Sequence, residues 1–202
     1  PDMASIIFMI PGLVGLLLQQ QTLLLTAFAI VREKEMGTVE QILVTPIRPW
    51  EVMLGKIMPN IAIAFFNMST ILALGILWFD VPFNGDIWLF FALAFLFLFT
   101  SLGLGILIST VATSQKQAQE LARLLILPSM MLSGFIFPRE AMPPVLQWLG
   151  SLIPVTYFLK ISRGIITKGV GLDSLHEPVI ALVIFGVVVF LLSARTFRTR
   201  LD

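Results

Sequence analysis

The sequence predicts an all-α, polytopic helical membrane protein. Hydrophobic residue types make up 57% of the 202 residues and charged types only 12%, about half the quarter that is usual in soluble domains. The mean hydropathy of +0.97 agrees with this class. These values exclude an ordinary soluble domain and a disordered chain. The net charge of +1 gives no general reason to expect nucleic-acid binding, and the absence of cysteine excludes disulfides and thiolate metal sites.

Five apolar stretches approach or exceed the roughly 20 residues that an α-helix needs to cross a bilayer. They are Ile6–Val31, Ile57–Phe79, Ile87–Ala112, Leu121–Phe137 and Pro178–Ala194. Their apolar content is continuous, which is typical of membrane helices. The sequence therefore predicts a single transmembrane domain over residues 1–202 with five spans.

A sixth apolar stretch, Met142–Phe158, contains four residues that interrupt helices. They are Pro143, Pro144, Gly150 and Pro154. Proline lacks an N–H group and clashes with the preceding turn inside a helix. We therefore expect a re-entrant helical hairpin here, which enters and leaves on one side and has its broken backbone covered by protein.

Lysine and arginine predict the orientation of the spans. Nine of the 13 basic residues fall on the side that holds the loop Arg32–Lys56 and the tail after Arg195. This side is expected to be cytoplasmic, which places Asp80–Asp86 and Pro138–Glu177 outside. The chain then starts outside. Because a chain that starts there usually follows a span or a signal, further sequence is expected N-terminal to residue 1.

The cytoplasmic loop after the first span contains a short predicted helix. Thr38 and Gln41 have capping-box spacing, Pro46 ends the helix, and Gly37 lets the chain turn into it. The apolar residues of one face and the acids around them are Met36, Val39, Leu43, Glu33, Glu35 and Glu40. This pattern fits an amphipathic helix on the membrane surface and equally a docking element for a cytoplasmic partner.

No pattern in the sequence supports a catalytic or nucleotide-binding site. Lys56 follows Gly55, as in a phosphate-binding loop. That motif also needs a glycine and a Ser or Thr where Trp50 and Ile57 stand. His176 is the sole histidine of the sequence, and no zinc-protease or serine-hydrolase motif occurs. We expect no enzyme activity and no cofactor or metal bound by this chain.

Three adjacent glutamines, Gln19, Gln20 and Gln21, lie in the middle of the first span. Successive residues of a helix point about 100° apart, so at least one glutamine must face protein or water and not lipid. Interhelical hydrogen bonding and a role in a substrate path both remain open. The surrounding residues are apolar, which favours a lipid-like or amphipathic cargo over a small ion.

Other polar and small residues within the spans predict helix packing. Asn60 and Asn67, seven residues apart on one face of the second span, are expected to form interhelical hydrogen bonds. Ser101, Gly105 and Ser109 form a small-residue ridge at spacing four.

The fourth predicted span contains residues that suit the lining of a substrate pathway. Pro128 predicts a kink, and Met130 and Met131 supply pliable apolar surface.

Two blocks of the sequence resemble a known family. EKEMGTVEQILVTPIRPWEVMLGKIMP resembles the cytoplasmic loop of type-2 ABC exporter permeases, the membrane subunits of bacterial drug, lipid and polysaccharide exporters. LSGFIFPREAMPPVLQWLGSLIPVTYFLKISRGI, Leu132–Ile165, resembles the region of that family in which a span is followed by re-entrant helices. Both blocks occur in the family's order and at its separation.

The resemblance implies that the five stretches are spans two to six of a six-span permease. The first span and an external domain would then lie N-terminal to residue 1. It implies a multi-pass protein of the inner (plasma) membrane that forms a homo- or heterodimer in lipid. Two ATP-binding subunits, which would bind ATP and Mg, would dock beneath that dimer.

The resemblance also assigns roles to residues. Gly37–Pro46 corresponds to the coupling helix, the spans Ile6–Val31 and Leu121–Phe137 to the substrate path, and Pro143–Phe158, with Tyr157, to the outer gate. The expected function is therefore export of an amphipathic or lipid-like substrate through a dimer interface. The alternatives are a stand-alone channel or gradient-driven carrier, which usually has ionisable residues near the membrane centre, and a non-transporting membrane scaffold.

Overall fold

The computed structural model describes residues 3–37 and 49–198, and the regular structure of these residues is helical. The elements are α1 (Met3–Met36), α3 (Pro49–Phe79), α4 (Ile87–Val111), α5 (Gln115–Leu132), the 3₁₀ turn η1 (Arg139–Ala141), α6 (Pro144–Gly150), α7 (Pro154–Ile166) and α8 (Leu172–Arg198). The predicted all-α fold is confirmed.

Four helices contain segments that are long and apolar enough to cross a bilayer. They are Met9–Met36, Met58–Phe79, Ile87–Val111 and Leu172–Ser193. These segments confirm four of the five predicted spans. Prolines inside α1, α3 and α8 do not end those helices.

The helix found at the fourth predicted span, Leu121–Phe137, has different bounds. α5 begins at Gln115, because the Ser114 side chain caps it by accepting a hydrogen bond from the N–H of Gln117 at 3.2 Å. It ends at Leu132, and Gly134 follows with a φ of +90°, a left-handed conformation that suits glycine. The correction has a physical reason: the cap extends the helix into a polar turn, and the glycine stops it before Phe137.

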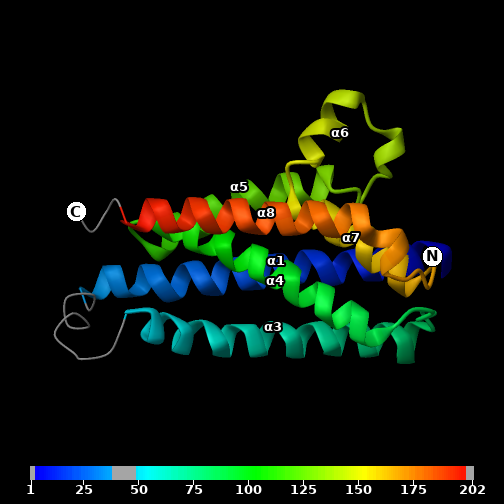
Figure 1. The fold of residues 1–202 in the computed structure, drawn as a ribbon, viewed down its shortest axis with the longest axis horizontal. Coiled ribbons are helices and arrows are strands. Elements are labelled where there is room, and N and C mark those ends of the chain that lie inside the picture. Colours follow the sequence, from blue (N-terminus) through cyan, green and yellow to red (C-terminus); the bar gives the residue numbers. More distant parts are fainter. Residues whose placement is uncertain (1–2, 38–48, 199–202) are drawn as a thin grey trace.

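The predicted break within Met142–Phe158 is confirmed. α6 and α7 form a pair that is bent by 89°, and α7 continues beyond Phe158 to Ile166. In Figure 1, α6 projects from the side of the bundle, whereas α7 lies within it.

The helices form a bundle in which the start of α1 and the end of α8 lie at opposite ends (Figure 1). α5 starts beside the end of α1, since the backbone N–H of Gln115 donates a hydrogen bond to the carboxylate of Glu35. α7 ends beside the loop between α3 and α4, where the N–H of Asn84 donates to the carbonyl of Ile166 at 3.1 Å. The path from α5 through α7 therefore traverses the bundle once more, so that the described helices make five passages.

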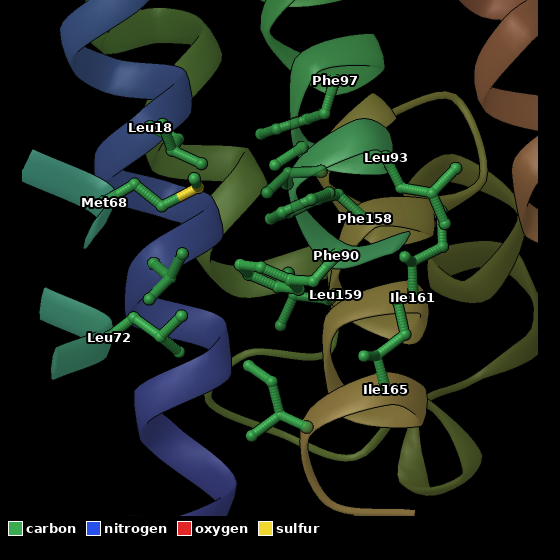
Figure 2. Close-up of a cluster of buried hydrophobic side chains, with 14 of the residues drawn as sticks. Leu18, Met68, Leu72, Phe90, Leu93, Phe97, Phe158, Leu159, Ile161 and Ile165 are labelled. Carbon is green, nitrogen blue, oxygen red and sulfur yellow. The ribbon is translucent and has the colours of Figure 1, made fainter. Parts of the chain in front are cut away.

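The core lies where α1, α3, α4 and α7 meet, and aromatic rings fill its centre (Figure 2). Phe97 of α4 and Phe158 of α7 stack with their ring centroids 4.4 Å apart and an interplanar angle of 7°. Leu18 of α1 and Met68 of α3 are buried beside them. Such offset stacking adds to the stabilisation from burial of the rings.

Close approach of α1 and α4 depends on Gly105. A Cβ atom at Gly105 would lie 2.8 Å from the carbonyl oxygen of Leu23 and 2.8 Å from the Cβ of Thr26. Ser101 and Ser109, one turn to either side, are also buried. The close contact at Gly105 and the burial of both serines confirm the predicted packing role of the small-residue ridge. Such close contact matters because lipid supplies no hydrophobic force that would bring helices together.

Two exposed tryptophans mark one end of the bundle. Trp78, near the end of α3, is 79% exposed, and Trp88, at the start of α4, is 80% exposed. Tryptophan is enriched at membrane–water interfaces. The pair therefore indicates that the loop between α3 and α4 lies at a membrane surface.

Replacing Gly105 by alanine should destabilise the protein. The added methyl group meets backbone on α1, so the helices must separate, at a cost of about 1–3 kcal/mol. Thermal or denaturant unfolding in detergent would measure the change. Gly55→Ala is the matched control, because nothing lies within 4 Å of a Cβ there. Equal stability of the two variants would contradict the packing argument.

The orientation can be tested with single cysteines, since the chain has none. Ser174 and Lys116 are exposed at opposite ends of the bundle. In whole cells, an impermeant thiol reagent should label Ser174→Cys and leave Lys116→Cys unlabelled until the membrane is opened. The reverse pattern would invert the topology.

Candidate functional site

The three glutamines of α1 point in three directions. Gln19 is 2% exposed. Gln21 is half-buried and its Oε1 accepts a hydrogen bond of 2.8 Å from Nδ2 of Asn67 on α3. Gln20 is exposed. These positions confirm that at least one glutamine faces protein, and they confirm the interhelical role of Asn67.

Gln20 belongs to an exposed stripe along α1. Met9 is 45% exposed, Leu13 is 38% exposed, and Leu24 is half-buried. The spacings of four, seven and four residues place these side chains with Gln20 on one helix face. We call this face the α1 stripe. An amide in the middle of an apolar membrane face is costly against lipid, so another protein surface or water is the favourable partner.

The predicted pathway residues of α5 lie on two sides of that helix. α5 continues through Pro128, which is exposed, and the predicted kink remains a prediction. Met131 is 58% exposed, whereas Met130 packs against the core cluster. The structure thus does not bring the six predicted pathway residues together in one cavity, because Gln19 and Met130 face the protein interior.

The three predicted gate prolines begin helices. Pro143 is the N-cap residue of α6, and Pro144 follows at the first helical position. Pro154 occupies the corresponding position of α7. Proline is tolerated there because the first N–H groups of a helix have no intrahelical acceptor. The prolines therefore define where each half of the hairpin starts.

The break between α6 and α7 is satisfied by side chains of α7. The hydroxyl of Thr156 donates to the carbonyl of Gly150 at 2.6 Å, and the Tyr157 hydroxyl donates to the carbonyl of Ser151 at 2.8 Å. Gly150 also sits against α5, where a Cβ would lie 2.4 Å from the carbonyl oxygen of Leu132. Protein groups thus cover this broken backbone, as a non-helical segment in a membrane requires.

Two arginines that the sequence reasoning missed also hold this hairpin. Nη2 of Arg139 donates to Oγ of Ser151 at 2.9 Å and to the carbonyl of Gln147. Nη1 of Arg163 donates to the carbonyl of Gly134 at 3.0 Å. In the sequence they stood out only as basic residues of an outer loop. Their partners are mainly backbone carbonyls, which leave no signal in a sequence.

The cytoplasmic end of α1 carries the described part of the predicted coupling region. α1 ends at Met36, which is 63% exposed, and Gly37 has a φ of +65°, a left-handed conformation that suits glycine at the end of a helix. Glu33 is half-buried, and the exposed Glu35 accepts hydrogen bonds from Gln115. Six further predicted coupling residues lie outside the described residues: Thr38, Val39, Glu40, Gln41, Leu43 and Pro46.

An open cavity of about 590 Å³ lies beside this end of α1. Phe28 and Leu25 form its apolar part, and Arg32, Asn60 and Gln115 line it with polar groups. Asn60 therefore lines a cavity at the membrane edge, whereas Asn67, on the same helix, makes an interhelical bond.

Comparison with known proteins decides the family. A family model described as ABC-2 family transporter protein matches residues 1–195. The chain belongs to this ABC-2 family. The resemblance seen in the two sequence blocks is thereby confirmed.

Several ABC transporter permeases are similar to this ABC-2 chain. It is 32% identical over 166 residues to the probable multidrug ABC transporter permease YbhR of Escherichia coli K12, which covers 82% of this chain and 45% of that protein. It is 36% identical over 179 residues to the inner membrane transport permease YhhJ of the same organism, covering 87% and 47%. ABC transporter G family member 20 of Dictyostelium discoideum is 27% identical over 192 residues, covering 95% and 26%.

The ABC-2 chain spans about half the length, or less, of these curated relatives. Its family and its apolar helices make it a multi-pass protein of the inner membrane.

Substitutions of Gln20 and of Gln21 should differ in their effect on the stability of the folded protein. Gln21→Leu removes the hydrogen bond to Asn67, and buried interhelical hydrogen bonds contribute about 0.6–1.7 kcal/mol. Gln20→Leu, at an exposed position, should change stability by less than about 0.5 kcal/mol. Unfolding in detergent and a double-mutant cycle with Asn67→Leu would measure both effects. Equal losses from the two variants would show that Gln20 is also a packing residue.

Proposed function

We propose that this chain forms the membrane-spanning part of a permease subunit of an ATP-driven exporter. Two permease subunits would pair along a shared interface and move an amphipathic or lipid-like substrate outward through it. The proposal is supported by membership of the ABC-2 family and by the printed names of the relatives YbhR and YhhJ, which are ABC transporter and transport permeases.

The observation that carries the proposal is the α1 stripe. It presents one amide, Gln20, on an otherwise apolar exposed face in the middle of a span. A surface of this kind can contact both the apolar and the polar part of an amphiphile. A small ion would need a denser set of polar or charged ligands.

The distribution of charge supports the same substrate class. The charged residues of the four candidate spanning segments lie at their ends, as Arg32 does in α1 and Asp173 does in α8. Gradient-driven carriers usually place ionisable residues near the membrane centre, where they bind the coupling ion. An external source of energy is therefore the better fit.

The energy source in this proposal is a separate ATP-binding subunit, which would bind ATP and Mg. That subunit would dock on the loop Gly37–Pro46, which follows α1 in the sequence. α1 is one helix of 34 residues, about 51 Å long at 1.5 Å per residue. A push on its cytoplasmic end would therefore tilt the whole helix and the α1 stripe with it.

The bent pair α6 and α7 is the proposed outer gate. Its break is held by side-chain hydrogen bonds from Thr156, Tyr157 and Arg139 and not by apolar packing alone. Hydrogen bonds of this kind can be exchanged for water when the gate opens outward. ATP-dependent closure of the partner subunits would then tilt α1, part the dimer interface and release the gate.

Purification of the full-length permease with its ATP-binding subunit, followed by reconstitution in proteoliposomes, tests the function. Leu43→Asp would place a charge in the docking surface. Binding of the ATP-binding subunit, or substrate-stimulated ATP hydrolysis, should fall about tenfold or more, since loss of one interface anchor costs over about 1–2 kcal/mol. Glu40→Gln, which removes one of the acids expected from the sequence around the same surface, is the control and should have a smaller effect.

The outcomes separate the alternatives. Substrate flux that needs no ATP would identify a channel or a gradient-driven carrier. A protein that recruits no ATPase and transports no lipid or drug candidate would be a membrane scaffold. Normal recruitment and export by the Leu43→Asp variant would remove the loop from the mechanism.

A further inference from the structure

Two neighbouring residues at the end of α1 contact two other helices. The carboxylate of Glu35 accepts a hydrogen bond of 2.9 Å from the backbone N–H of Gln115 and one of 2.7 Å from its side-chain Nε2. The ammonium group of Lys34 donates to the carbonyl of Ser109. α1 is thus tied to the last turn of α4 and to the first turn of α5.

The signs of the two charges match the helix ends that they meet. Gln115 is the first residue of α5, where N–H groups lack intrahelical partners and the helix dipole is positive, so an anion is stabilised there. Ser109 lies in the last turn of α4, where free carbonyls make the helix end negative and favour a cation. The acid and the base could not exchange places without losing both contacts.

Small side chains continue this connection into the membrane. Leu23 and Ala27 of α1 are buried in one cluster with Ala118 and Ala122 of α5. Alanine lets the two helices approach closely over more than one turn. The polar contact at the end and the apolar contact behind it therefore join α1 and the first half of α5.

We propose that Lys34 and Glu35 form a two-charge clamp that delivers movement of the loop 38–48 to α5 as well as to α1. This inference rests on the proposed function, in which that loop receives the push from the ATP-binding subunit. Both residues are positioning residues. Glu35 would act through Gln115, and α5 would carry the displacement towards Gly134, where Arg163 of the gate is bound.

The position of the clamp supports this route. Gly37 follows Glu35 after one residue, so the docking loop begins directly beyond the clamp. The end of α1 and the start of α5 lie at the same end of the bundle (Figure 1). Without the clamp, the connection that remains between α1 and the start of α5 among the described residues is the apolar cluster behind it.

The test uses the full-length permease in complex with its ATP-binding subunit, reconstituted in proteoliposomes with a fluorescent phospholipid and a lipophilic dye as probes. Glu35→Ala removes both acceptors. Gln115→Glu sets two carboxylates against each other. The double variant Glu35→Gln with Gln115→Glu restores both hydrogen bonds, because the new amide accepts from the N–H of residue 115 and donates to the new carboxylate.

We expect probe transported per ATP hydrolysed to fall at least threefold in both single variants and to return to within twofold of the wild type in the double variant. Because Glu35 also borders the predicted docking surface, recruitment of the ATP-binding subunit and basal hydrolysis are measured in every variant, and they should not change in Gln115→Glu. Lys116→Ala, at an exposed neighbouring position on α5, is the matched control and should transport normally. A purely structural role would instead lower the amount of folded complex.

A chemical cross-link gives a second measurement that does not depend on the double variant folding. Glu35→Cys with Gln115→Cys should show the same loss of coupling, and bridging the thiols with a short bifunctional reagent should restore it. Wild-type coupling in the single variants, or no recovery in either the exchanged or the bridged pair, would overturn the clamp. If the wild-type permease recruits no ATPase, the proposed function fails first and independently of the clamp.

Discussion

The close approach of other helices to α1 is the constraint on which the rest of the structure depends. Lipid tails are as apolar as the side chains of this protein, so helices associate only where their surfaces fit closely. Glycines provide that fit. A Cβ at Gly12 would lie 2.4 Å from the ring of Phe135, and one at Gly15 would lie 2.9 Å from Phe158 of α7. On another side of α1, a Cβ at Gly105 of α4 would lie 2.8 Å from the carbonyl oxygen of Leu23. Through the middle of the span, the described side chains of α1 are most exposed along the α1 stripe, and this face gives the chain a surface for a partner or a substrate.

The same enclosure leaves polar groups inside the bundle. Oε1 of Gln19 and the hydroxyls of Thr22 and Thr26 are buried, and none of them has a hydrogen-bond partner among the described protein groups. Their spacings of three and four residues place them on one face of α1, and Thr26 lies against Gly105. A buried group without a partner costs about 1–3 kcal/mol. The threonine hydroxyls can be satisfied by rotating onto a backbone carbonyl one turn back, as Thr100 of α4 does on Leu96, whereas Gln19 needs a polar group or a water molecule between the helices.

The sequence determined the features that depend on local pattern. Unbroken apolar runs located α1, α3, α4 and α8, prolines located the break between α6 and α7, and the 100° step between residues predicted that the glutamines would diverge. Contacts between distant segments decided the rest. Which glutamine is buried depends on where α3 and α4 lie around α1, and a single sequence does not give this. The bond between Glu35 and Gln115 joins residues 80 positions apart, and Arg163 binds a carbonyl, so neither contact leaves a pattern. The bounds of α5 were missed because hydropathy does not register a capping serine or a left-handed glycine.

Both ends of α5 are held by the same physical principle. At its start, the Glu35 carboxylate accepts from the free N–H and the side-chain amide of Gln115, and beyond its end the Arg163 guanidinium donates to the carbonyl of Gly134, where the chain has left the helix. Between these points, Ala118 and Ala122 pack against α1, while Leu124 and Met131 face outward. A helix of 18 residues is stiff compared with the single hydrogen bonds at its ends. A displacement passed to Gln115 would therefore be carried along the helix towards Gly134, from one of these polar contacts to the other. These contacts can exchange with water, whereas the apolar packing between them cannot, and this difference makes α5 suited to connect the two ends of the bundle.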